Sequence, residues 1–227
     1  MASTIVDRDS ILLKLIAVSL LTSIATMSQA ADVRAIAEAV DRHYNHLRTL
    51  ECEFTETYSG SGSERTETGT LWLKKPGKMR WEYRSPRAKL FVGDGKNVWF
   101  YVPSERQVRK TSMKKLDDLR SPLAFLLGKT QLGKELLGLS LAPEVAPLAS
   151  GDVMLKGVPK GFQDRLTQVL LEITAESSIR RIVMKETDGA TIEYRFSEQN
   201  EDVAINDQHF EFRVPDGVEV VDENFGQ

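Results

Sequence analysis

The chain has few of the residues on which enzymes most often build chemistry. Of its 227 residues, one is cysteine and three are histidines, so no intramolecular disulfide can form. His43 and His46 are three residues apart, but no further cysteine or histidine is spaced to complete a zinc site. The sequence also lacks a G-x-S-x-G elbow, a P-loop and a Rossmann fingerprint. We therefore expect no catalysis, no metal and no cofactor.

A surplus of positive charge is missing as well. The formal net charge is −3 at pH 7, whereas a nucleic-acid-binding protein would favour a basic surface. The 41% hydrophobic and 28% charged residues are ordinary for a globular protein. The apolar run Leu15–Ile24 is too short for a membrane span, which takes about 20 residues.

That short run has the surroundings of a secretory signal. Arg8 and Lys14 precede it, and Ser28-Gln29-Ala30 offers the small residues that a signal peptidase reads. We predict a signal peptide over residues 1–30 and one domain over residues 31–227; a buried N-terminal helix or an anchor is the alternative. Because the residue directly after Ala30 is alanine and not cysteine, we expect a soluble, monomeric periplasmic protein without a lipid anchor.

Hydrophobic periodicity predicts a helix followed by a mainly antiparallel sheet. Asp32–Leu50 carries one apolar stripe at helical spacing, and Leu116–Leu139 is a leucine-rich stretch with helical character. Short alternating segments separated by turn signals read as strands. These are Thr68–Lys74, Lys78–Arg84, Ala88–Val92, Asn97–Val102 and Gln107–Thr111, then Asp152–Gly157, Leu166–Ile173, Arg180–Glu186, Ala190–Ser197 and His209–Val214, after a first strand around Cys52–Tyr58.

The fold class is therefore mainly β with helices. A single antiparallel sheet of about eleven strands cannot stay flat and curls into a partial or closed barrel. The apolar helices would then cover its concave face. In the segment L-W-L-K-K-P-G-K-M-R-W-E-Y, alternation sends Met79, Trp81 and Tyr83 to one face and the charges to the other face and the turn. This separation argues against a basic groove that stacks single-stranded nucleic acid.

Two motifs resemble the LolA family of periplasmic lipoprotein carriers. They are G-T-L-W-L-K-K-P-G-K-M-R-W-E-Y-R-S-P, at Gly69–Pro86, and L-F-V-G-D-G-K-N-V-W-F-Y-V-P, at Leu90–Pro103. Ser121–Gly128 looks like the family's lid helix, and Phe210–Val220 looks like its last strand and exit. The resemblance implies an unclosed half-barrel of eleven strands with a helical lid.

The resemblance also implies a function. Such a carrier accepts the acyl chains of outer-membrane lipoproteins from an inner-membrane ABC-type release complex and passes them to an outer-membrane acceptor lipoprotein. Binding of the acyl chains in an apolar cavity is favoured, because each CH₂ kept out of water is worth about 0.8 kcal/mol. The alternatives are an exported lipid-sensing regulatory domain on the same half-barrel, and the acylated acceptor, which would need a cysteine after Ala30.

The candidate site residues are apolar side chains that either line an acyl-chain cavity or form ordinary core. Trp72 lies between two leucines and could face either way. Lys75 stands where the family has an arginine that holds the lid, so it is a candidate lid contact. The full candidate set for acyl-chain binding is Trp72, Met79, Trp81, Tyr83, Phe91, Trp99, Tyr101, Leu119, Leu123, Leu126 and Leu127.

Overall fold

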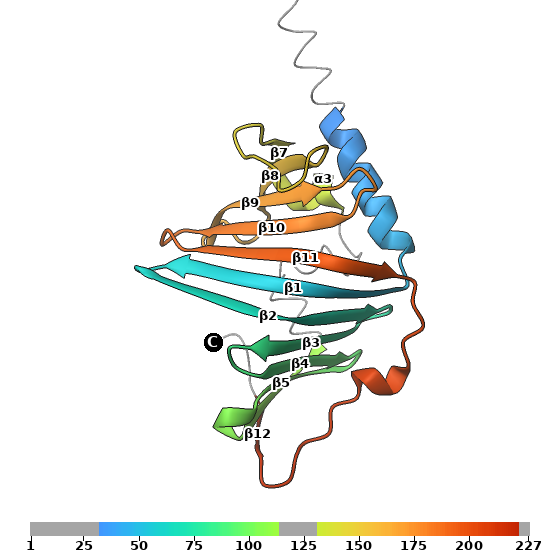
Figure 1. Cartoon of the computed structure of the whole chain (residues 1–227), viewed down its shortest axis with the longest axis vertical. Coiled ribbons are helices and arrows are strands. Elements are labelled where there is room, and N and C mark those ends of the chain that lie inside the picture. Colours follow the sequence, from blue (N-terminus) through green and yellow to red (C-terminus); the bar gives the residue numbers. More distant parts are fainter. Residues whose placement is uncertain (1–31, 114–130, 223–227) are drawn as a thin grey trace, which may run out of the picture.

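The structure is a computed structural model that describes residues 32–113 and 131–222. Within these residues, twelve strands form one sheet in the order β12-β6-β5-β4-β3-β2-β1-β11-β10-β9-β8-β7. The two ends of that order do not pair with each other, so the curved sheet is open, as Figure 1 shows. This confirms the predicted fold class. Among the described residues, no helix combines the length and apolar character that a membrane crossing would need.

The first half of the chain builds the sheet outward from its middle, and the second half builds it inward from the opposite edge. The strands β1 to β6 run in sequence order to one side, and the chain then continues at the opposite edge and returns until β11 pairs with β1. Consecutive strands in each half pair antiparallel, as the short loops predicted. Their bounds are β1 Thr49–Gly60, β2 Ser63–Lys74, β3 Lys78–Ser85, β4 Lys89–Asp94, β5 Asn97–Val102 and β6 Gln107–Ser112, then β7 Leu136–Leu141, β8 Val153–Pro159, β9 Leu166–Ile173, β10 Ile179–Glu186 and β11 Thr191–Glu201.

The C-terminal part of the chain departs from the prediction. No strand forms over His209–Val214; instead η3, a 3-10 helix, spans Asp207–Phe210, and the last strand is β12, Glu219–Asp222. β12 pairs parallel with β6, whereas an antiparallel sheet was expected. The alternation that suggested a strand has another cause. Phe210 is buried and Phe212 contacts aromatic side chains of the sheet, although their backbone joins no ladder.

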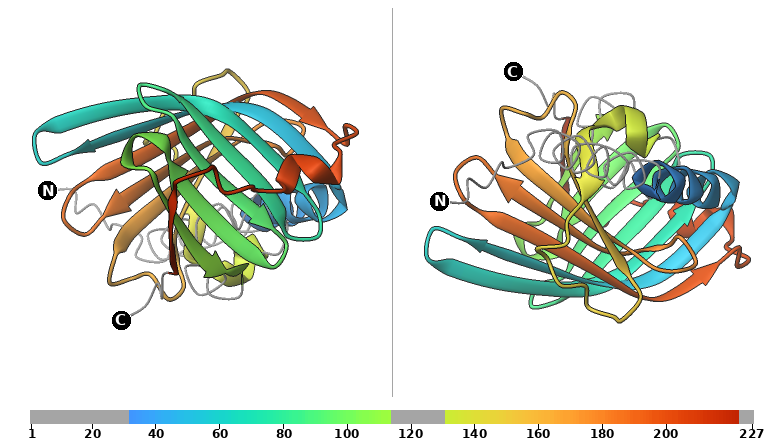
Figure 2. Two further views of the ribbon diagram at one scale, coloured as in Figure 1. Left: turned by 90° about the horizontal axis from the view of Figure 1, so that it is seen from below. Right: turned by 90° about the horizontal axis from the view of Figure 1, so that it is seen from above.

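The N-terminal helix covers residues 32–46 and lies within the curve of the sheet (Figure 2). Its apolar stripe is buried against the sheet, with Val40 and Tyr44 each 2% exposed. The helix ends earlier than predicted because Thr49 and Leu50 already belong to β1. Cys52 of β1 lies in the same core and is 1% exposed.

Within residues 131–139, the helical character predicted for the leucine-rich stretch is only partly confirmed. Where the structure describes it, the helix α3 covers only Leu132–Glu135, and Leu136–Leu141 forms the edge strand β7. Leu132 and Leu136 are buried in the main core, which explains why their spacing resembled a helix. The remainder of the predicted lid, including Leu119, Leu123, Leu126 and Leu127, lies outside the described residues.

A second, smaller core lies on the convex face. Ala142, Met154, Leu170 and Val183 pack together under the loop that joins β7 to β8. The carboxylate of Glu172, which has no exposed side-chain surface, pairs with Arg181 at 2.7 Å. It also accepts a hydrogen bond of 2.6 Å from the backbone N–H of Leu148. This buried pair therefore ties the loop to strands β9 and β10.

Candidate functional site: the concave face of the half-barrel

Along β2 and β3, alternate side chains point to opposite faces of the sheet. On β2 and β3, Leu71 pairs opposite Trp81 and Leu73 opposite Met79, and all four are 5% exposed or less. They pack in the core that the N-terminal helix covers. This apolar surface, on the inside of the curve, is the concave face.

Five aromatic rings from three strands form a group on the concave face. The ring of Phe54, on β1, lies 4.8 Å from the ring of Trp81 and 4.9 Å from that of Tyr83, measured between centroids. Tyr194, on β11, meets Trp81 edge-on at 5.7 Å and stacks on Phe196 at 6.3 Å. Offset and edge-on pairs at these separations add to the free energy gained from burial alone. We call these five residues the aromatic group.

Four of the predicted site residues belong to this face. Met79 and Trp81 are each 3% exposed, and Tyr83 and Phe91 are partly buried against the same core. Phe91 lies opposite Trp81 in the β3–β4 register, so both side chains point to the same side. The structure thus brings these four residues together on β3 and β4.

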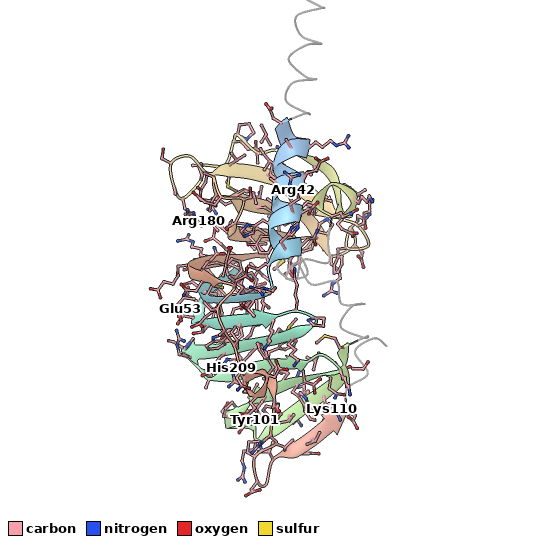
Figure 3. All side chains as sticks on the ribbon, turned by 90° about the vertical axis from the view of Figure 1, so that its right-hand side faces the viewer. Arg42, Glu53, Tyr101, Lys110, Arg180 and His209 are labelled. Atoms are coloured by element: carbon pink, nitrogen blue, oxygen red, sulfur yellow. The ribbon has the colours of Figure 1, made fainter. Side chains whose placement is uncertain are left out.

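Three predicted residues lie on the other face, so grouping them with the concave set is wrong. The ring centroid of Trp72 is 4.6 Å from that of His209. The rings of Trp99 and Tyr101 lie 5.5 and 5.8 Å from Phe212. Figure 3 shows His209 over the middle strands and Tyr101 nearer the β12 edge. We call residues 202–222, which follow β11, the C-terminal segment. His209 and Phe212 of this segment pack on aromatic residues of the convex face. For this reason β5 carries aromatic residues on both of its faces.

Four further residues, which were not predicted as site residues, are placed with the concave set by the register. Phe100 lies opposite Phe91, which in turn lies opposite Trp81. Phe54, Tyr194 and Phe196 complete the aromatic group. The alternation of β1 and β11 showed their phase. The β1–β2 and β2–β3 hairpins bring Phe54 beside Trp81, whereas Tyr194 and Phe196 reach this place only through the pairing of β1 with β11.

Lys75 anchors the end of the N-terminal helix. Its ammonium donates a hydrogen bond to the carbonyl oxygen of Tyr44, and its backbone N–H donates to the carbonyl of Arg48 at 2.9 Å. A cation at a helix C-terminus is favoured by the helix dipole. Burial lowers the pKa of Lys75, partly opposed by the charge of Asp202. Lys75 thus contacts the N-terminal helix. The contact predicted between Lys75 and the lid involves residues 114–130, which lie outside the described part.

The other lysines of this turn hold the C-terminal segment. The carboxylate of Asp207 pairs with the ammonium of Lys74 at 2.6 Å and with that of Lys78 at 2.8 Å. These hydrogen bonds lower the pKa of Asp207 to about 2. The basic turn of the sequence therefore joins the sheet to both flanking segments.

A cleft of about 820 Å³ opens between the N-terminal helix and α3. Val33, Ala37 and Leu136 contribute apolar surface to its lining. Across the cleft, Asp41 accepts the backbone N–H of Leu132 at 3.0 Å. Burial raises the pKa of Asp41, and that hydrogen bond opposes the rise.

The histidines of the N-terminal helix do not make a catalytic arrangement. Nε2 of His43 lies 2.8 Å from a carboxylate oxygen of Glu201 and 3.3 Å from the hydroxyl of Ser178. A serine triad instead divides its nucleophile and its carboxylate between the two ring nitrogens. Across residues 32–113 and 131–222, no three His, Cys, Asp or Glu side chains are placed to hold a metal ion.

Comparisons with family models and with curated proteins point to one family, and a solved structure shares the fold. The family model described as "Outer membrane lipoprotein carrier protein LolA" matches residues 45–213. The outer-membrane lipoprotein carrier protein of Hahella chejuensis is 32% identical over 93% of this chain and 98% of its own length. That of Chromobacterium violaceum is 30% identical, over 91% and 95%. A crystal structure of an uncharacterized conserved protein from Thermus thermophilus covers 86% of this chain and 100% of that one, with a TM-score of 0.55 and 15% identity.

Proposed function

Because this chain belongs to the LolA family of outer-membrane lipoprotein carrier proteins, we propose that it carries lipoproteins across the periplasm. Residues 1–30 would direct export and be removed, leaving residues 31–227 as a single carrier domain. The cargo's acyl chains would lie on the concave face. The protein makes or breaks no covalent bond in this role; its work is binding and release.

The observation that carries the proposal is the apolar lining of the concave face. The aromatic group, Leu71 and Met79 belong to one apolar cluster inside the curve of the sheet, which acyl chains would reach by displacing the segments that cover it. Each CH₂ group removed from water contributes about 0.8 kcal/mol, so such a surface can hold acyl chains that water rejects. Trp72, Trp99 and Tyr101 pack under the C-terminal segment instead, and we leave them out of the proposed binding set.

The partners follow from the same role. An inner-membrane ABC-type complex would release the lipoprotein to this chain, and an outer-membrane acceptor lipoprotein would take it over. The carrier must also release its lipoprotein to the acceptor, so its affinity for the acyl chains cannot be as high as the apolar face alone would allow. A lid formed by the segment with Leu119, Leu123, Leu126 and Leu127 would compete with acyl chains for the concave face, so that each binding event must displace it.

A release assay tests this proposal. Purified mature protein is incubated with inner-membrane vesicles that contain acylated lipoproteins, and the soluble fraction is analysed by mass spectrometry. We expect lipoproteins in complex with the carrier, and fewer with a Trp81→Asp variant, which puts a charge on the concave face. A protein that stays empty in this assay and in periplasmic extracts would contradict the carrier role and favour a lipid-sensing domain.

A further inference from the structure

A polar cluster borders the aromatic group on the concave face. It consists of Glu56, Glu67, Tyr83, Lys89 and Tyr194. Glu56 is two residues from Phe54 on β1 and lies opposite Tyr194 on β11 and Glu67 on β2. Tyr83 lies opposite Lys89 in the β3–β4 register. Four strands and their neighbour β11 thus direct polar groups to one place, directly beside the apolar lining.

Two tyrosines form the boundary between the apolar and polar parts. The ring of Tyr83 contacts the ring of Phe54, while its hydroxyl donates to a carboxylate oxygen of Glu56 at 2.8 Å. The Tyr194 ring contacts Trp81, and its hydroxyl also interacts with Glu56. Burial, then nearby negative charge, raises the pKa of both phenols, so both remain protonated donors at neutral pH.

The two carboxylates of the cluster, Glu56 and Glu67, differ in burial and in their ion-pair partners. The Glu67 side chain is 6% exposed and pairs with the Lys89 ammonium at 2.5 Å. That ammonium also lies 4.3 Å from the centre of the Tyr83 ring. Glu56 is half-buried, and within the described part of the chain no cationic side chain comes within ion-pair distance of it. Glu56 and Glu67 lie directly opposite each other on β1 and β2, and like charges in such positions are destabilising.

Glu56 therefore retains capacity to bind something else. A carboxylate offers about four acceptor positions, and the two phenols occupy about two of them. A hydrogen bond from an N–H donor to a carboxylate is stronger than one between neutral groups. An acyl chain that lies on the aromatic group with its polar end toward Tyr83 and Tyr194 would bring that end within reach of Glu56.

We propose that Glu56 is a polar subsite that binds N–H donors, amide or ammonium, borne by the head of an acylated ligand. This inference rests on the proposed carrier function and names the part of the cargo that the carrier recognises beyond its acyl chains. The peptide amides next to an acylated N-terminus have this chemistry, and so does an unmodified amine. An anionic head, by contrast, would be repelled by Glu56 and Glu67.

Isothermal titration with four ligands of equal chain length tests the subsite. The ligands are hexadecylammonium, N-palmitoylglycinamide, palmitate and methyl palmitate, each used as monomers. We expect one or both N–H ligands to bind about tenfold more tightly than palmitate, as one charge-assisted hydrogen bond allows. The ammonium and amide arms show which donor the site prefers, and methyl palmitate reports the chain alone.

Variants then assign that preference to Glu56. Glu56→Gln keeps the shape and removes the charge, so we expect it to abolish the preference for ammonium while methyl palmitate binds as before. Glu64→Gln is the matched control, because Glu64 is exposed on the same hairpin and accepts from Ser59. It should keep the wild-type preference. The order of affinities of the wild type for the four ligands is measured without any variant. That comparison therefore still tests the subsite if Glu56→Gln folds poorly.

The outcomes separate this inference from the carrier proposal. Equal affinity of the wild type for all four ligands, tighter binding of palmitate, or an unchanged preference in folded Glu56→Gln would overturn the subsite and leave the carrier standing. Failure of every ligand to bind would overturn the carrier proposal and the subsite with it.

Discussion

The ring of Phe54 lies over Gly69 on the neighbouring strand, where a Cβ on Gly69 would come within 2.9 Å of Cε1 of Phe54. The same Cβ would overlap the carbonyl oxygen of Glu82. Strands β1, β2 and β3 approach each other here because the middle one has no side chain, and the β2–β3 register shifts at this glycine. The position of the aromatic group therefore depends on a residue that contributes no apolar surface.

Gly69→Ala should consequently destabilise the protein. Overpacking of this kind costs about 3 kcal/mol, and here the backbone itself must move. The measurement is the midpoint of urea unfolding. Gly133→Ala is the control: a Cβ there meets nothing within 4 Å, so the free energy of unfolding should change by less than about 1 kcal/mol. Equal effects of the two substitutions would contradict the close approach.

The three tryptophans allow the two faces to be distinguished in solution. Trp81 lies on the concave face, whereas Trp72 and Trp99 lie under the C-terminal segment. In variants that keep one tryptophan each, with phenylalanine at the other two positions, a brominated acyl chain should quench Trp81 strongly and the other two weakly. Bromine quenches only on near contact, so strong quenching of Trp99 would refute the assignment of faces.

The buried pair of Glu172 and Arg181 should be sensitive to removal of one partner. Glu172→Leu leaves a guanidinium whose side chain is 9% exposed without its nearest carboxylate. Such losses cost about 3–5 kcal/mol. The double variant Glu172→Leu, Arg181→Leu should recover much of the loss in a double-mutant cycle by thermal or urea unfolding. Additive losses would show that the two charges do not stabilise each other.

His209 should make the docking of η3 sensitive to mild acid. Burial, followed by the charge of Arg80, lowers the pKa of His209, and the charges of Glu82 and Glu51 oppose this shift. The unfolded state therefore binds more protons between the folded pKa and about 6.5, and stability falls as the pH falls through that window. We expect the Tm to drop more between pH 7.5 and pH 5 in the wild type than in His209→Leu. Identical pH profiles would argue against this role of His209.

Lys75 should stabilise the end of the N-terminal helix. Lys75→Met removes the donor to the Tyr44 carbonyl and should lower the free energy of unfolding by about 1 kcal/mol, since the ammonium is partly exposed. Lys75→Arg keeps a donor and should retain most of that stability. Lys96→Met, at an exposed turn, serves as the control. Equal stability of the Lys75→Met and Lys96→Met variants would show that the bond contributes nothing.

Most strands could be predicted because alternation and turn residues agree. Asn97–Val102 and Leu166–Ile173 have the predicted bounds. Alternation failed where both faces are covered: on β5 it could not say whether Trp99 or Phe100 faces the core. It also failed at Phe210 and Phe212, which pack onto the sheet without joining a ladder.

The candidate site was only partly predictable for a related reason. Met79, Trp81 and Tyr83 share a phase within one strand, so the sequence alone groups them. The contact of Trp81 with Tyr194 depends on the pairing of β1 with β11, strands far apart in the chain. Local patterns contain no information on that pairing. Such long-range contacts determine where the polar cluster meets the aromatic group.

The single cysteine gives this protein a built-in reporter of opening. Cys52 lies in the core beneath the N-terminal helix, and burial raises the pKa of its thiol to about 12. Only the thiolate reacts with alkylating reagents, so the closed molecule should be nearly inert to them. The labelling rate of the native chain then measures how often the helix and the sheet separate, with no engineered probe. A cargo that holds them apart should speed that labelling.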